Sequence, residues 1–353
     1  MSNTTVVGQY RSVVRRRLLF ILATLAVLVA AAVVALTTGP IELTGSQVVA
    51  ALLGRADPIP TRVVWRIRLP RIVAAIGAGL GLAVAGAAIQ SVLRNPLGSP
   101  YTLGISQAAA FGAAFAIVVL GSGTTANSGT VISVTNPYLT ATAAFTGSLL
   151  STGVILGVAK LKRATPETMV LTGIALAALF TAGTTSLEFF ATNTELATIV
   201  FWKFGDVSGT TWEVNAIVWT VSIAGAVYFV RNAWAYNVLD AGDETASSLG
   251  VDVDRTRMVG MLVASLVTAV VVSVFGIIGF VGLVVPHIVR RVIGGDERFL
   301  LPASCVAGGT LLLVADTVAR TVVAPVVLPV GVVTSFVGVP LFVYLIIKGR
   351  SYW

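Results

Sequence analysis

The chain has 353 residues, of which 56% are hydrophobic and only 11% charged, and its formal net charge is +8. A soluble domain carries about 25% charged residues, so this composition excludes an ordinary soluble protein and predicts that lipid solvates much of the chain. The basic residues form short clusters between apolar runs, which is typical of membrane topology and argues against nucleic-acid binding.

Ten apolar segments approach the length of about 20 residues that a membrane helix needs. The first, 18–38, follows the basic cluster 11–17 and is longer than the apolar core of a signal peptide, about 7–15 residues, so we expect a retained helix. The Gly-rich stretch 275–282 separates the seventh segment from the eighth and is compatible with a broken or re-entrant helix. The remaining segments are 72–93, 101–121, 138–159, 168–190, 214–231, 258–276, 278–293, 299–319 and 326–347.

These segments predict an all-α, polytopic membrane protein with a single transmembrane domain over 1–353 and a helical bundle over 18–347. Glycines at 77, 79, 81 and 86 in the second segment let neighbouring helices approach closely, because no side chain separates the backbones.

An even number of spans places both termini on one side of the membrane. With the N-terminus in the cytoplasm, 16 of the 23 basic residues lie on the cytoplasmic side, as the positive-inside rule requires. Those on the outer side are Arg55, Arg62, Arg66, Arg68, Arg71, Lys203 and Arg320.

Two long polar segments connect the spans, 37–71 outside and 231–257 inside. The inner segment contains Asp240, Asp243 and Glu244, and its composition favours one or two short helices at the membrane surface, with a solvated loop as the alternative.

The sequence indicates no catalytic or metal centre. None of the lysines stands in a phosphate-binding GxxxxGK motif, and His287 is the only histidine, so no second imidazole completes a metal site. Active transport then needs a partner ATPase or a coupled ion. Ion coupling usually requires intramembrane carboxylates, and the candidates are Glu188 and Asp316, of which Asp316 can pair with Arg320 four residues later.

Several strings, in this order, are similar to one family, the FecCD-type permease subunits of ABC importers for ferric siderophores, haem and cobalamin. The strings are RLPR at 68–71, RNPLG at 94–98, LGI at 103–105, LGV at 249–251, GFVGLVVPH at 279–287, ADTVAR at 315–320 and LPVGVVT at 328–334.

The resemblance implies a type II importer permease of about ten helices that works as a homodimer or as a paired heterodimer, and we expect the homodimer. It also implies two separate ATPase subunits, which bind ATP and magnesium, and an extracytoplasmic substrate-binding protein. The permease itself would then be a multi-pass cell-membrane protein without a cofactor of its own and would not be an enzyme.

The resemblance identifies 232–257 as the segment that couples to the ATPase. We expect Gly242 and Gly250 to bound a short helix with Asp243 near its start, where a carboxylate complements the free N–H groups. Ala246 and Leu249 would lie on one face and pack into the ATPase. The predicted coupling residues are Leu239, Gly242, Asp243, Ala246, Leu249 and Gly250.

The resemblance also implies that Arg68, Arg71 and Arg320 meet acidic residues of the binding protein, since a guanidinium pairs bidentately with a carboxylate. Two alternatives are that the arginines anchor helix ends at the headgroups, or that Arg320 pairs with Asp316. The chain departs from the family pattern at three places, where Asp243, Gly98 and Val327 replace the usual Glu, Ala and Glu.

Two functions remain open at this point. The first is an ABC importer permease for a ferric siderophore, with cobalamin or haem as the alternative cargo, and the second is an ion-coupled secondary transporter. A neighbouring gene for an ATPase, or an ATPase that co-purifies, would discriminate between them.

Overall fold

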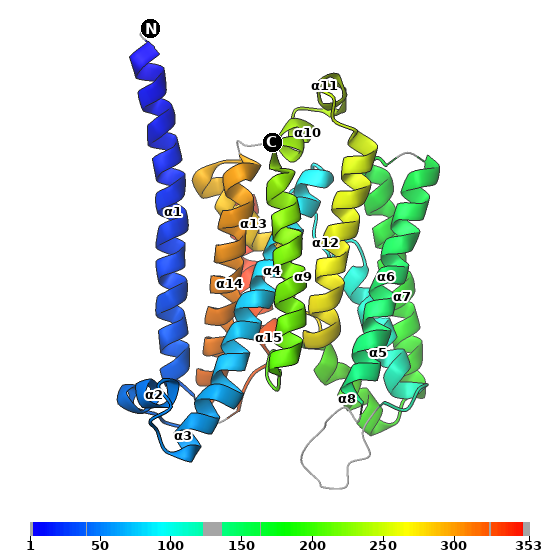
Figure 1. Cartoon of the computed structure of the whole chain (residues 1–353). Coiled ribbons are helices and arrows are strands. Elements are labelled where there is room, and N and C mark those ends of the chain that lie inside the picture. Colours follow the sequence, from blue (N-terminus) through cyan, green and yellow to red (C-terminus); the bar gives the residue numbers. More distant parts are fainter. Residues whose placement is uncertain (1–2, 40, 123–135, 163, 325, 349–353) are drawn as a thin grey trace.

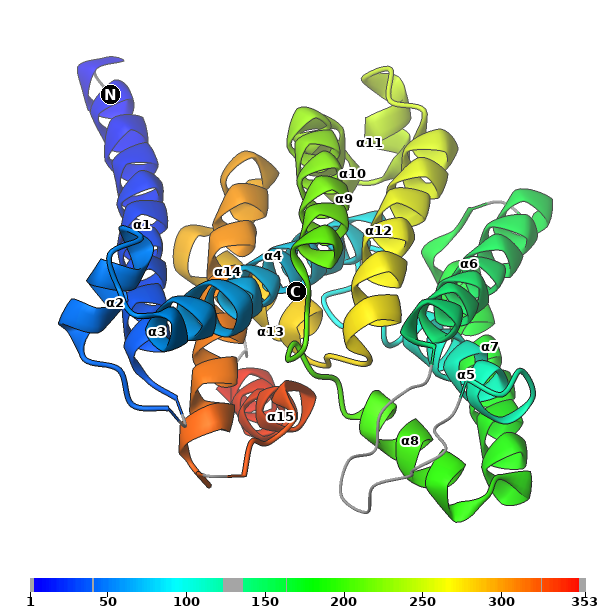
Figure 2. The ribbon, with the colours of Figure 1, turned by 60° about the horizontal axis from the view of Figure 1, so that its bottom comes forward.

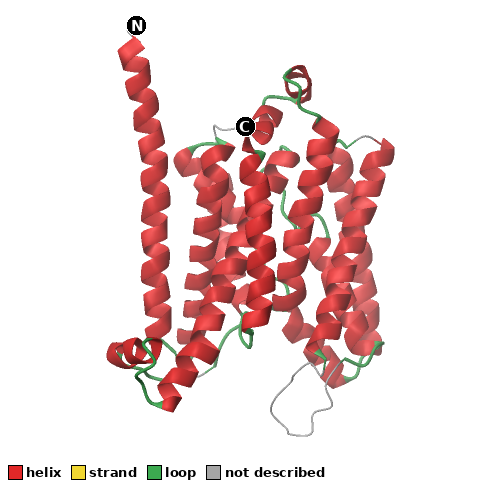
Figure 3. Ribbon diagram, viewed as in Figure 1, coloured by secondary structure: helices red, strands yellow, loops and turns green. Residues whose placement is uncertain are grey.

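The computed structural model describes residues 3–39, 41–122, 136–162, 164–324 and 326–348, and these residues form helices and connecting loops without a strand (Figure 3). The basic residues Arg163 and Arg350 lie outside the described residues. The helices are α1 (Asn3–Thr37), α2 (Gly45–Leu52), α3 (Pro58–Val63), the π-helical turn η1 (Val64–Arg68), α4 (Leu69–Val92), α5 (Ile105–Val118), α6 (Pro137–Lys162), α7 (Pro166–Phe190), α8 (Asn193–Lys203), α9 (Trp212–Arg231), α10 (Ala233–Asp240), α11 (Asp243–Ser248), α12 (Val253–Phe275), α13 (Val281–Ile293), α14 (Glu297–Thr321) and α15 (Val330–Lys348).

Seven of the described helices are long and apolar enough to cross a membrane, and they correspond to seven of the ten predicted segments. The other three predicted segments form the shorter helices α5, α13 and α15. Helices α5 and α13 have 14 and 13 residues, about 20 Å each at ~1.5 Å per residue, which is less than the ~30 Å hydrocarbon core. The rest of these two segments is non-helical backbone.

The centre of the bundle is α4, which runs between α14 on one side and α9 and α12 on the other (Figures 1 and 2). A Cβ on Gly79 would lie 2.3 Å from the carbonyl oxygen of Gly308 in α14, and one on Gly86 would lie 1.8 Å from that of Gly282 in α13. The predicted close approach of helices at these glycines is therefore confirmed.

Both ends of the chain lie at the same end of the bundle, which also carries α10 and α11 (Figure 1). We call this the α11 end. The opposite end carries α2, α3 and α8 and is called the α2 end. The polar segment 231–257 contains α10 and α11, so the prediction of short helices there is confirmed.

Candidate functional site

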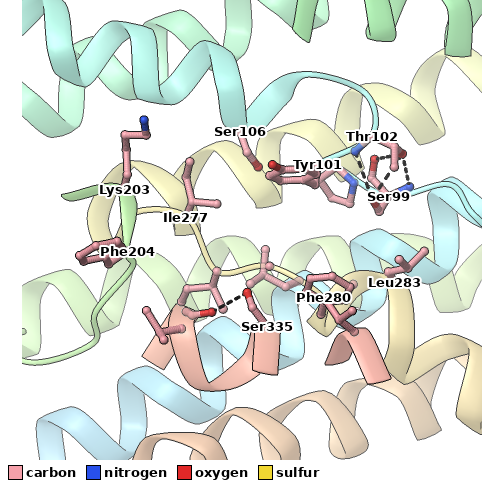
Figure 4. A pocket seen from close by; sticks show the side chains of 18 of the residues that line it. Ser99, Tyr101, Thr102, Ser106, Lys203, Phe204, Ile277, Phe280, Leu283 and Ser335 are labelled. Carbon is pink, nitrogen blue, oxygen red and sulfur yellow. Dashed lines mark hydrogen bonds between the residues drawn. The ribbon is translucent and has the colours of Figure 1, made fainter. Parts of the chain in front are cut away.

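A cavity of about 820 Å³ opens where the three short helices α5, α13 and α15 begin. Its polar side chains come mainly from the start of α5 and the preceding turn, with Ser335 facing them from α15 (Figure 4). The lining residues are Leu82, Ser99–Thr102, Ser106, Lys203, Phe204, Thr268, Ile277–Phe280, Gly282, Leu283, Gly331, Val332, Ser335, Phe336, Val339 and Pro340.

The backbone breaks beside the cavity depend on residues that tolerate unusual geometry. Gly276 ends α12 with φ 71°, and a Cβ there would lie 2.2 Å from the Trp202 carbonyl oxygen. Gly331 donates its N–H to the Gly205 carbonyl at 3.2 Å, which holds the start of α15 against the α8–α9 loop. Non-helical backbone at membrane depth is tolerated only where protein or a water-filled cavity surrounds it, and these breaks lie beside such a cavity. The glycine-rich stretch 275–282 was the sequence signal for it, although no lining residue was predicted.

At the α2 end, Asp316 of α14 is fully buried between two arginines. Arg71 donates from Nε to both carboxylate oxygens at 2.9 and 3.1 Å, and its Nη2 lies 2.8 Å from Oδ1. The Nε of Arg320 lies 3.3 Å from Oδ2. The expected Asp316–Arg320 pair is present, and Arg71 is the stronger partner of the same carboxylate.

The arginines predicted to dock the binding protein are all buried, with 3%, 9% and 5% of their surface exposed for Arg68, Arg71 and Arg320. Arg68 donates to the carbonyls of Leu36 and Ile41, and Arg320 donates to those of Ala35 and Thr38 at 3.4 and 3.3 Å. The carbonyls of Ala35 and Leu36 belong to the last turn of α1, where the helix dipole favours positive charge, and those of Thr38 and Ile41 follow it. The structure thus brings the three arginines together, facing groups of their own subunit.

At the α11 end, helix α11 runs from Asp243 to Ser248 with Gly242 at φ 110° before it and Gly250 at φ 83° after it, as expected from the sequence. Asp243 accepts two hydrogen bonds from Arg257, at 2.8 and 2.7 Å, and its Oδ1 lies 2.6 Å from Nη2 of Arg94. Arg257 is buried and also donates to the carbonyls of Val92 and Ala164 at 3.2 and 3.4 Å. A single buried cation therefore connects α11 to the end of α4 and to the α6–α7 connection.

The expectation that Ala246 packs into the ATPase is wrong, because Ala246 is fully buried inside the subunit, as is Leu239. Leu249 is 56% exposed and Trp234 of α10 is exposed too, so these are the large apolar side chains that this segment presents to its surroundings. Sequence reasoning missed Trp234 and Arg257, although an apolar aromatic residue within a polar segment was a visible signal for the former.

Replacing Asp243 with asparagine should lower the thermal stability of the protein, because Arg257 then lacks its counter-charge; a buried group without its partner costs about 1–3 kcal/mol. The hydrogen bonds from Arg257 hold the pKa of Asp243 below its ordinary value. The contribution of the Asp243–Arg257 pair to the free energy of unfolding is fully present above about pH 4. It is lost as the pH falls through the lowered pKa of Asp243. Thermal melts should show a wild-type advantage near pH 7 that shrinks below about pH 4. An advantage independent of pH would contradict this assignment.

Within the described part of the chain, no group of three or more His, Cys, Asp or Glu side chains is arranged to hold a metal ion. The chemistry available is thus ion pairing at the two ends and a largely apolar, hydroxyl-bearing cavity between them.

Comparison with known proteins gives a consistent result. Residues 26–348 match the model of the FecCD transport family. An ABC transporter permease protein of Methanocaldococcus jannaschii is 50% identical, over 96% of this chain and 97% of that protein. The cobalamin import system permease of Halobacterium salinarum is 42% identical, over 80% and 73%. A solved metal-chelate type ABC transporter in an inward-facing conformation aligns with a TM-score of 0.81 and 27% identity, over 93% of this chain and 98% of that one.

The long apolar helices and these relatives establish an all-α, multi-pass membrane protein with the architecture of type II importer permeases. The chain therefore belongs to the FecCD transport family and is the permease subunit of an ATP-binding-cassette importer, in which the ATPase is a separate subunit.

Proposed function

We propose that this permease moves a ferric siderophore or a related metal chelate across the cell membrane into the cytoplasm. The family match over 26–348 carries this proposal. Two relatives are named as haemin and Fe(3+)-citrate permeases and are 35% and 34% identical. Their names support a metal chelate as the cargo of this chain. Cobalamin or haem is the alternative cargo. The working assembly would be a homodimer with two ATPases and an extracytoplasmic binding protein.

The α11 end supports a coupling role. Its helix α11 is held by Asp243 and Arg257, and it presents the exposed Leu249 beside the polar face of the segment. An exposed apolar side chain on a rigidly held helix suits insertion into a cleft of the ATPase. Residues 239–250 would then transmit the movement of the ATPase to α4 and α12.

Reconstitution into liposomes tests the function. Liposomes that contain permease, ATPase and binding protein should take up radiolabelled chelate only when the ATPase is supplied with ATP. Liposomes with an ATPase variant that cannot hydrolyse ATP should take up no chelate. Uptake by the permease alone, driven by a proton or sodium gradient, would instead support the ion-coupled secondary transporter.

The topology is predicted by the distribution of basic residues and by the common location of the two termini. We expect both termini in the cytoplasm and the segments 39–71 and 191–213 outside. A cysteine at Asp57 should react with an impermeant maleimide in intact cells, after Cys305 is replaced with serine. Labelling of this position only after the cells are opened would place the α2 end in the cytoplasm.

Docking of the binding protein at the α2 end remains a proposal. Arg71 and Arg320 pair with one fully buried carboxylate, Asp316, and Arg71 also lies 3.7 Å from Asp206. Arg68 donates to backbone carbonyls instead, so these three cations exceed the two carboxylates beside them. This positive charge would attract an acidic surface of the binding protein. To contact the buried guanidinium groups, the acidic residues would have to replace the partners that the arginines have within their own subunit.

The variant Arg68→Glu/Arg71→Glu is compared with Arg62→Glu/Arg66→Glu, whose arginines are exposed at the same end. If the predicted residues dock the partner, the first variant should weaken binding by at least about tenfold more than the second. Salt should weaken wild-type binding and affect the variant less. The measurement is the affinity of the folded transporter for its binding protein. A larger loss in the second variant would assign docking to the exposed arginines.

A further inference from the structure

The side chains that line the cavity at the starts of α5, α13 and α15 limit the charge of a cargo that can bind there. Lys203 is its only charged side chain among the described lining residues, and Lys203 is paired with Glu188 at 3.0 Å. The lining is otherwise apolar apart from hydroxyl groups and backbone. A multiply charged anion would therefore lose its hydration here without gaining an unpaired cation, which is costly.

Two residues that line the cavity, Ser106 and Tyr101, make no side-chain hydrogen bond within the described part of the chain, and Tyr101 is 53% exposed. Ser106 is only 4% exposed, and Figure 4 shows it beside Tyr101 on the α5 side of the cavity. The Ser106 hydroxyl is not among the buried oxygen atoms that lack a partner, so it is reached from the cavity and is available to bond a ligand there. By contrast, Ser99 and Thr102 bond each other, and Ser335 donates to the carbonyl of Gly331 at 2.8 Å.

We propose that this cavity is a contact site for a metal chelate with little net charge, whose amide, hydroxamate or hydroxyl groups bond Ser106 and Tyr101. This inference rests on the proposed function and narrows its cargo to neutral chelates, against polyanionic ones. A volume of about 820 Å³ is within the range of small-molecule sites.

The test uses the permease–ATPase complex in detergent without the binding protein, so that the specificity of that protein does not interfere. Binding of ferrichrome, a neutral ferric hydroxamate, and of ferric enterobactin, an anionic catecholate, is measured by equilibrium dialysis with radiolabelled iron. We expect saturable binding of ferrichrome that is at least about tenfold tighter than that of ferric enterobactin.

The variant Ser106→Ala should weaken ferrichrome binding by about three- to tenfold, the value of one hydrogen bond. The matched control is Ser304→Ala, because Ser304 is also a buried serine without a hydrogen-bond partner, but it lies in α14 and does not line the cavity. The control should bind ferrichrome like the wild type. The variant Ser335→Lys places a cation in the cavity and should raise the relative affinity for ferric enterobactin.

Three results would overturn the proposal: tighter binding of the anionic chelate by the wild type, equal effects of Ser106→Ala and Ser304→Ala, or no saturable binding of either probe. ATP-driven uptake of an anionic chelate would reject the inference while the proposed function stands. Absence of ATP-driven uptake of any metal chelate by the complete transporter would reject the proposed function itself.

Discussion

Asp316→Asn is expected to be the most destabilising single substitution among the ion pairs described above. It leaves Arg71 and Arg320 buried without their carboxylate, and breaking a buried ion pair by removing one partner costs about 3–5 kcal/mol. The variant should accumulate poorly in the membrane and melt at a clearly lower temperature in detergent.

Glu188→Gln provides the matched control, because Glu188 pairs with Lys203 at 3.0 Å but both side chains are partly exposed. A partly exposed pair contributes about 0–1 kcal/mol, so this variant should melt like the wild type. The double variant Asp316→Leu/Arg71→Met should recover part of the lost stability by removing an unpaired charge together with its partner. Equal melting temperatures for Asp316→Asn and Glu188→Gln would show that the buried carboxylate is not needed for the fold.

Leu249→Arg is expected to abolish most transport while the bundle stays intact. Because Leu249 is 56% exposed, an arginine there is solvated in the free subunit and should not change insertion or melting. Burial of a leucine side chain at an interface contributes about 1.5–3 kcal/mol, so its replacement by a charge should weaken ATPase association by about ten- to a hundredfold. Co-purification of the ATPase and ATP-dependent uptake in liposomes measure the two effects.

Leu53→Arg is the matched control for association, since Leu53 is 63% exposed at the α2 end, away from α11. This variant should retain the ATPase. If Leu249→Arg retained the ATPase and took up chelate normally, α11 would be a solvated surface helix without a coupling role.

Much of the architecture could be predicted from the sequence because its causes are local. A run of about 20 apolar residues predicts a membrane helix wherever it occurs, and the positions of basic residues predict orientation from the chain alone. The break at 275–282 was visible in its glycines, and the short helix at 243–248 was visible in its flanking glycines and first-turn carboxylate. The ordered motifs from 68 to 334 identified the family, which the match over 26–348 confirmed.

Only the tertiary structure decided which side chains are buried and which groups they bond. In a membrane protein the lipid-facing surface is as apolar as the core, so hydrophobicity does not reveal which face of a helix packs inward. In the polar segment outside the membrane, the sequence also could not show that Ala246 is buried and Leu249 exposed, because only the packing of this short segment against the rest of the subunit separates them. It indicated Asp316 with Arg320 from their local spacing, but the stronger partner, Arg71, is 245 residues away in the chain. Such pairs, and the convergence of α5, α13 and α15 on one cavity, form only when distant segments pack together, so no local pattern encodes them.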